Sequence, residues 1–219
     1  MSRADRTKTS ETRSPLPALA MTTVVGTTYF ALVIAAMHFI RPDLNPIERP
    51  TSEYAVGPFG YLMTSAFLSL SVGTWALVIG LRRDLPHRAH LRIGTMFLAL
   101  WGVGLVVAAT FPIVPEGAPQ TLAGTIHGIN GPLTFLSLTI GMNLVSRAFT
   151  SDSRWRQIHR FAAALALLMI PEFVVGGVAR ARGSGAGLAQ RLLILTFATW
   201  FLLVASHLRS DAVRLGKGP

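Results

Sequence analysis

Residues 61–81 read YLMTSAFLSLSVGTWALVIGL, and residues 82–92 read RRDLPHRAHLR. The first stretch carries no charged side chain, whereas the second carries four arginines. A helix that spans the hydrocarbon core of a bilayer needs about 20 mostly apolar residues. Together the two stretches predict a membrane-spanning helix that ends in a short basic loop.

The same pattern, a long apolar block between polar connections, recurs along the chain. Because the backbone cannot bond to water inside hydrocarbon, apolar blocks of this length form helices, and they lack the alternation of a membrane β-barrel. The sequence therefore predicts an all-α integral membrane bundle of six transmembrane helices. The six predicted blocks are Leu19–Ile40, Tyr61–Leu81, Ile93–Phe111, Ile126–Ser146, Phe161–Ala179 and Leu192–Ser206.

The predicted domain organisation has three parts. Residues 1–18 are predicted to be a disordered basic cytoplasmic tail, residues 19–208 the six-helix transmembrane domain, and residues 209–219 a short cytoplasmic tail. The first apolar block is longer than the core of a secretory signal, which has about 7 to 15 residues. No small-x-small cleavage site follows the block, so we interpret it as an uncleaved helix.

The composition excludes several classes of protein. The chain has 219 residues and a net charge of +10, yet only 14% of its residues are charged and 51% are hydrophobic. That apolar content excludes intrinsic disorder, and the absence of cysteine excludes a disulfide scaffold or a zinc–thiolate site. Excess Lys and Arg also occurs in nucleic-acid-binding proteins. The positions of the basic residues therefore decide between a membrane protein and a nucleic-acid-binding protein.

The basic residues gather on alternate connections. Fifteen of the twenty lie in the two tails and in the second and fourth connections, and five lie in the first and fifth. Short cytoplasmic loops carry such an excess, so both termini are predicted to be cytoplasmic in the inner (plasma) membrane of a bacterium. The basic loops are predicted to contact anionic membrane lipids rather than nucleic acid, and Trp155 among them is predicted to be an interfacial anchor.

The connections on the predicted outer side are rich in proline. The first, residues 41–60, contains four prolines, which fix φ and remove donors, so we expect no long regular helix there. Gly57-Pro58 and Gly60 predict a turn into the second helix. Residues 111–119 have the same character, and we expect both connections to cap the outer mouth of the bundle.

Three stretches carry a resemblance to a known family. Residues 52–63 read SEYAVGPFGYLM, residues 187–193 read GLAQRLL, and Phe111-Pro112 is followed by Pro115 and then by His127. These stretches resemble a bacterial multi-pass membrane family catalogued as domain of unknown function 998. The resemblance covers nearly the whole chain after the N-terminal tail. It implies a six-helix fold and no particular reaction.

The chain departs from that family at one position. An Asp is frequent in the family between the two prolines of the second outer connection, where this chain has Val114. An acidic role at this position is therefore in doubt, unless Glu116 replaces it.

Glu172 is the clearest candidate for chemistry within the spans. It lies about eleven residues into the fifth block, a depth of about 16 Å at the helical rise. Ionisable residues within a membrane usually face a bundle interior or a cavity. Gly176 and Gly177 follow it and are expected to allow another backbone to approach closely. The same is expected of Gly124 and Gly128, two small residues four positions apart around the start of the fourth block. The alternative is a structural Glu that holds helices together.

His127 and Asn130 share one face at the start of the fourth block, together with Gly131 and Thr134. A close-packed interface with interhelical hydrogen bonds explains this face; a neutral imidazole also suits a general base or a ligand. Arg191, near the outer end of the sixth block, is a candidate partner for Glu172 or for Glu53 in the first outer connection.

The sequence thus predicts an outward-facing polar pocket formed by Glu53, His127, Asn130, Glu172 and Arg191. The leading hypothesis is a small-molecule or lipid-binding membrane protein. The alternatives are a membrane-embedded hydrolase or transferase that acts on lipid through His127 and Glu172, and a secondary transporter that uses Glu172. No cofactor and no metal site is predicted, because the ligand clusters that such sites need are missing from the sequence.

Overall fold

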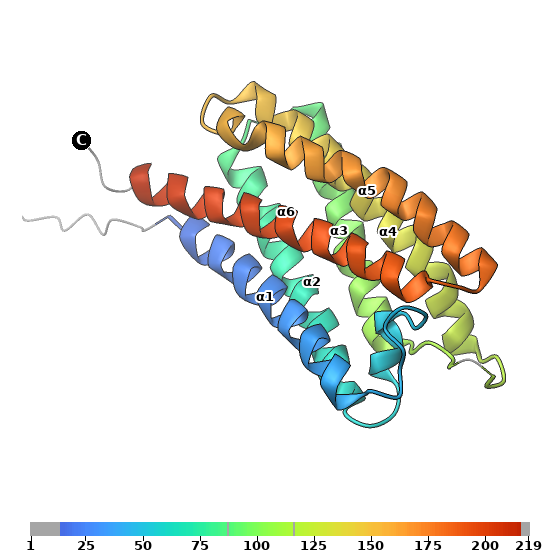
Figure 1. Cartoon of the computed structure of the whole chain (residues 1–219). Coiled ribbons are helices and arrows are strands. Elements are labelled where there is room, and N and C mark those ends of the chain that lie inside the picture. Colours follow the sequence, from blue (N-terminus) through green and yellow to red (C-terminus); the bar gives the residue numbers. More distant parts are fainter. Residues whose placement is uncertain (1–13, 87, 116, 216–219) are drawn as a thin grey trace, which may run out of the picture.

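The computed structural model describes residues 14–86, 88–115 and 117–215 (Figure 1). Residues 1–13 of the predicted tail, and Glu116, lie outside this described part. Within it the chain forms six long α-helices, two short 3-10 helices and no strand. The elements are α1 (Leu16–Ile40), η1 (Thr51–Ala55), α2 (Gly60–Asp84), α3 (Ala89–Thr110), α4 (Leu122–Ala148), η2 (Phe149–Ser151), α5 (Arg156–Arg182) and α6 (Ala186–Leu215).

The all-α prediction is confirmed, and each predicted apolar block corresponds to one α-helix. Most helices extend beyond their blocks into polar and basic sequence; α6, for example, continues to Leu215. The apolar blocks mark only part of each helix, because the backbone of a helix goes on bonding to itself wherever side chains at its ends can reach a polar environment.

Five of the six α-helices in the described part of the chain are long and apolar enough to cross a membrane, namely α1, α2, α3, α5 and α6. The sixth, α4, has 27 residues but no stretch that is as apolar over the same length, because amide side chains interrupt it. Of these amides, Asn130 bonds to the carbonyl oxygen of Gly104 in α3, and Asn143 bonds to that of Ala166 in α5. These two amides of α4 therefore bond to the helices on either side of it.

The helices run alternately up and down and form a closed ring (Figure 1). Each helix packs against its neighbours in sequence, and α6 closes the ring by packing against α1. Helix α1 begins and α6 ends at one end of the bundle, which we call the termini end. The connections α1–α2, α3–α4 and α5–α6 lie at the opposite end.

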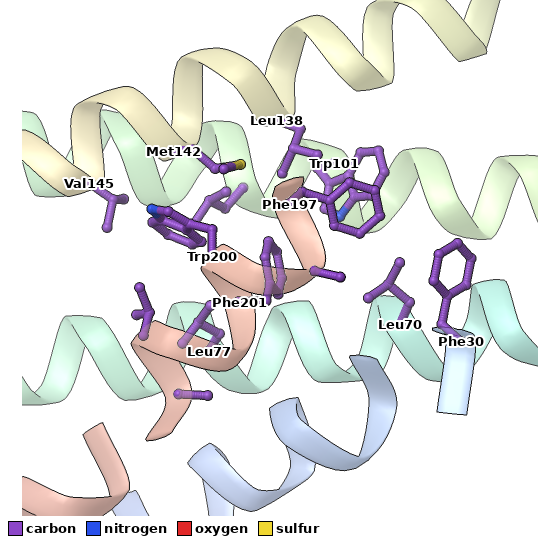
Figure 2. Close-up of a cluster of buried hydrophobic side chains, with 14 of the residues drawn as sticks. Phe30, Leu70, Leu77, Trp101, Leu138, Met142, Val145, Phe197, Trp200 and Phe201 are labelled. Carbon is purple, nitrogen blue, oxygen red and sulfur yellow. The ribbon is translucent and has the colours of Figure 1, made fainter. Parts of the chain in front are cut away.

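Aromatic side chains of α6 form the centre of the bundle (Figure 2). Phe197 lies 5.3 Å from Trp101 of α3 and 6.1 Å from Phe30 of α1 between ring centroids. Trp200 donates to the hydroxyl of Ser146 in α4 at 3.0 Å. Helix α6 therefore connects α1, α3 and α4 through contacts that lie inside the ring.

Small residues let α3 and α4 approach closely. A Cβ built on Gly104 would overlap Thr134, and one built on Gly141 would lie 2.9 Å from Leu98. Helix pairs in membranes associate through such close packing, because hydrocarbon provides no hydrophobic drive between apolar surfaces.

Candidate functional site

The α1–α2 connection, residues 41–59, folds against the start of α6 at the opposite end. Leu188 N–H donates to the carbonyl oxygen of Ile47 at 2.9 Å, and Thr51 N–H donates to Gln190 Oε1 at 2.7 Å. A Cβ on Gly187 would overlap the backbone of the connection. The expected absence of a long helix is confirmed, since the connection contains only the short helix η1.

Arg191 holds this connection to two helices. Its Nε donates to His38 Nε2 at 2.9 Å, its Nη2 to the Tyr54 hydroxyl at 3.0 Å, and its Nη1 to the carbonyl oxygens of Arg49 and Gly187. Tyr54 is almost fully buried. The guanidinium therefore joins the end of α1, the connection and the start of α6.

Glu53 lies in η1, beside Tyr54, and is buried. Arg49 Nη1 lies 3.6 Å from its Oε1, an ion pair between residues four apart. Glu53 lies within the folded connection and Arg191 contacts that connection from α6, so both help to hold the loop against the helices.

Asn130 joins α4 to α3. Its Nδ2 donates to the carbonyl oxygen of Gly104 at 2.9 Å, and its Oδ1 accepts from Thr134 at 3.0 Å. These two bonds set the orientation of the amide. The bond to Gly104 is interhelical, as the structural explanation for this face predicted, whereas the bond to Thr134 lies within α4.

His127 is buried near the start of α4. Its Nδ1 donates to the carbonyl oxygen of Phe111 at 2.8 Å. A carbonyl oxygen only accepts, so the neutral ring carries its proton on Nδ1, and Nε2 is an acceptor. The histidine is held in place from the α3–α4 connection, with one ring nitrogen left for another partner.

Glu172 lies elsewhere, on the face of α5 toward α6. Thr196 of α6 donates to its Oε1 at 2.8 Å, and its Oε2 is buried without a partner among the described residues. Within the described part of the chain no hydrogen bond joins Glu172 to His127 or to Arg191.

Two adjoining cavities lie near His127. The larger has a volume of about 150 Å³ and is bounded by α4, α5, α6 and parts of the α1–α2 and α3–α4 connections. The smaller, of about 60 Å³, extends toward α1, α2 and α3. Both are lined by Ser52, His127, Gly131, Phe135 and Gln190.

The structure brings together only part of the five-residue set. Among the five predicted residues, His127 lines both cavities and Asn130 lines the smaller one. Glu53, Glu172 and Arg191 are absent from both linings. A sequence pattern shows the depth and face of a residue on its own helix, but not which helix covers that face.

Three further polar residues, which the sequence pattern does not single out, line the larger cavity. These are Ser52 in η1, Gln190 in α6 and Arg180 in α5. Gln190 Oε1 accepts from Thr51, so its Nε2 faces other partners as a donor. The only feature of the sequence that could have indicated these residues is their position. Each lies at the predicted outer end of the bundle, on a different segment.

Not all glycines beside the cavity have the expected role. A Cβ built on Gly128, Gly131 or Gly177 would meet nothing within 4 Å. Close contacts were predicted for Gly124 with Gly128 and for Gly176 with Gly177. A Cβ on Gly124 would overlap Val114, and one on Gly176 would lie 3.8 Å from Leu193 of α6, so the prediction is wrong only for Gly128 and Gly177. These glycines of α4 and α5 leave open space where larger residues would fill it.

A separate ionic cluster joins the connections at the termini end. Arg154 forms ion pairs with Asp84 at the end of α2, with Asp152 two positions before it in the chain, and with Asp211 in α6. The guanidinium holds the pKa of Asp152 below its ordinary value. Trp155 is fully buried and donates to Asp84 at 2.7 Å, so its prediction as an interfacial anchor is wrong.

Comparison with known proteins identifies a family. No curated protein and no solved structure matches the chain. A family model, described as protein of unknown function (DUF998), matches residues 24–207. That range includes most of α1 and α6 and all the helices between them. The resemblance inferred from residues 52–63 and 187–193 is thereby confirmed, and the chain belongs to the DUF998 family of multi-span helical membrane proteins of unknown function.

Proposed function

We propose that the protein crosses the cytoplasmic membrane six times, with both termini inside, and binds a small molecule or lipid in the larger cavity at its outward end. The observation that carries the binding proposal is the open space at Gly128, Gly131 and Gly177, next to the oriented ring of His127.

Helix α4 is the span that apolarity alone does not identify. Its 27 residues extend about 40 Å at the helical rise, more than the hydrocarbon core of about 30 Å. Its amides bond to α3 and α5 rather than facing lipid. The alternating helices support an even number of crossings (Figure 1), and the fifteen basic residues of the tails and of the second and fourth connections support a cytoplasmic termini end.

Topology is tested with reporter fusions. We expect alkaline phosphatase to be active when fused after Ile47, in the α1–α2 connection, and inactive when fused at Lys217. Green fluorescent protein at Lys217 is the matched control and is expected to fluoresce, because it folds in the cytoplasm. Phosphatase activity at Lys217 would contradict the proposed orientation.

The larger cavity has the character of a ligand site. Such sites are mostly apolar with a few polar groups that orient the ligand, and this one combines Ile113, Phe135, Phe173 and Leu193 with the ring of His127. An apolar cavity of about 150 Å³ is large enough to bind benzene. The cavity therefore has room for a ring or a short stretch of hydrocarbon chain.

Gly131→Leu is expected to fill the cavity. Because leucine is also a better helix former than glycine by up to about 1 kcal/mol, the variant should remain folded. We expect native mass spectrometry of protein extracted in native-lipid nanodiscs to show a bound molecule in the wild type and its loss in Gly131→Leu. Val175→Leu, on the exposed face of α5, is the control and should retain it. Equal retention by all three proteins would contradict a ligand in this cavity.

A further inference from the structure

The larger cavity is polar at one end and apolar at the other. On α5, Arg180 lies seven residues beyond Phe173, about 10 Å along the helix. On α4, His127 precedes Phe135 by eight residues, about 12 Å. Arg180 and His127 are both near the opposite end of the bundle, so the polar groups lie at the rim and the aromatic rings lie deeper.

The rim is rich in hydrogen-bond donors. Arg180 is exposed and makes no hydrogen bond or ion pair with any described residue. Gln190 presents Nε2, because its Oε1 accepts from Thr51. The hydroxyl of Ser52 also lines the cavity. Two neutral side chains with donor groups and one cationic side chain therefore line the same cavity.

The described lining contains no Asp or Glu side chain. The nearest carboxylate along α5, Glu172, bonds to Thr196 and lines neither cavity. A free arginine fits a carboxylate or a phosphate better than it fits a neutral group, because the charge-assisted bonds are shorter and stronger. The rim thus has the charge and the donors of an anion site, above apolar walls.

We propose that the cavity binds an anionic amphiphile with a single hydrocarbon chain. Its carboxylate or phosphate head bonds to Arg180 and to the donors of Gln190 and Ser52, and the first part of its chain packs between Phe135, Phe173 and Leu193. This inference rests on the proposed function, because it names the class of ligand for the same cavity.

The test uses the full chain in phosphatidylcholine nanodiscs and three 12-carbon probes. Each probe carries a photoreactive diazirine on its chain, and the heads are a carboxylate, a phosphate and a neutral alcohol. We expect the anionic probes to label peptides of α4, α5 and α6 saturably, with half-saturation at about tenfold lower concentration than the alcohol, as expected for hydrogen bonds to a charged group. Preference for the carboxylate identifies a fatty acid, and preference for the phosphate a lysophospholipid; both support the proposal.

Arg180→Gln separates the head-group contact from the cavity itself. We expect it to weaken labelling by the anionic probes about tenfold and to leave labelling by the alcohol unchanged. Arg182→Gln is the matched control, since Arg182 is also exposed near the end of α5 but does not line the cavity. Unchanged alcohol labelling also shows that the variant is folded.

Two different failures are distinguishable. Equal affinity for the alcohol and the anions, with no effect of Arg180→Gln, would overturn the anionic ligand and leave a binding cavity intact. Labelling that never saturates with any probe, and that Gly131→Leu does not change, would overturn the proposed function itself.

Discussion

Arg154→Met is expected to lower the free energy of unfolding by about 3 kcal/mol, the lower end of the range measured when one partner of a buried ion pair is removed, because the Arg154 side chain is 30% exposed. Arg154 is the shared partner of Asp84, Asp152 and Asp211. The Asp84 side chain is only 4% exposed. Without the guanidinium, three carboxylates from three separate segments lie close together, and each loses its counter-ion.

The measurement is unfolding of the detergent-solubilised protein, followed by circular dichroism. Arg156→Met is the matched control, because Arg156 is exposed and forms no ion pair with a described residue. Asp84→Asn in the Arg154→Met background is expected to restore part of the loss, since it removes one unpaired charge. Equal stability of Arg154→Met and the wild type would show that the cluster does not hold the connections together.

The same cluster predicts a dependence on pH. Arg154 lowers the pKa of Asp152 in the folded protein, so this ion pair stabilises the fold above the unfolded pKa of about 3.9. The contribution is lost as pH falls through the lower, folded value. Below about pH 4 the wild type should therefore lose stability more steeply than Arg154→Met. Parallel pH profiles for the two proteins would argue against a role for the Asp152 pair.

Arg191→Met is expected to release the α1–α2 connection and to lower the free energy of unfolding by about 2 to 3 kcal/mol, as for lost hydrogen bonds to a charged group. The guanidinium donates to His38, Tyr54 and two backbone carbonyl oxygens. Methionine has a similar stem and none of these donors, so it leaves buried acceptors without partners.

Proteolysis measures this release directly. We expect Glu-specific protease to cut after Glu48 at least about tenfold faster in Arg191→Met, in proportion to the opening of the connection. Arg191→Lys should be intermediate, because an ammonium cannot reproduce the fork of donors. Arg182→Met is the control and should resist cleavage like the wild type. Wild-type resistance in Arg191→Met would mean that the other contacts of the connection suffice.

The helices were predictable because their signal is local. The 61–81 block carries its apolar length in its own residues, and α2 spans Gly60–Asp84 around it. The ends were less predictable, since the helical backbone continues into polar sequence. Helix α4 was the hardest case: whether Asn130 and Asn143 oppose membrane insertion depends on the carbonyl groups of α3 and α5 that they reach.

The candidate site was only partly predictable. His127 and Asn130 share a face that periodicity shows, and both line a cavity. Glu172 lies deeper in its own block, and its carboxylate turns toward Thr196, 24 residues away. Gly177 has the same small size as Gly104, but one leaves open space and the other permits close contact. The small size of a glycine therefore does not show whether it borders a cavity or allows close contact between helices.

By itself, the sequence determined the all-α class, the approximate extent of each helix and the family, because apolar length and motif are properties of contiguous residues. Only the tertiary structure decided which polar groups meet. Arg154 finds Asp84 across 70 positions, and Arg191 finds Tyr54 across 137. Those pairings, and the cavity beside His127, depend on how helices pack around one another, and hydrogen bonds act only over a few ångströms.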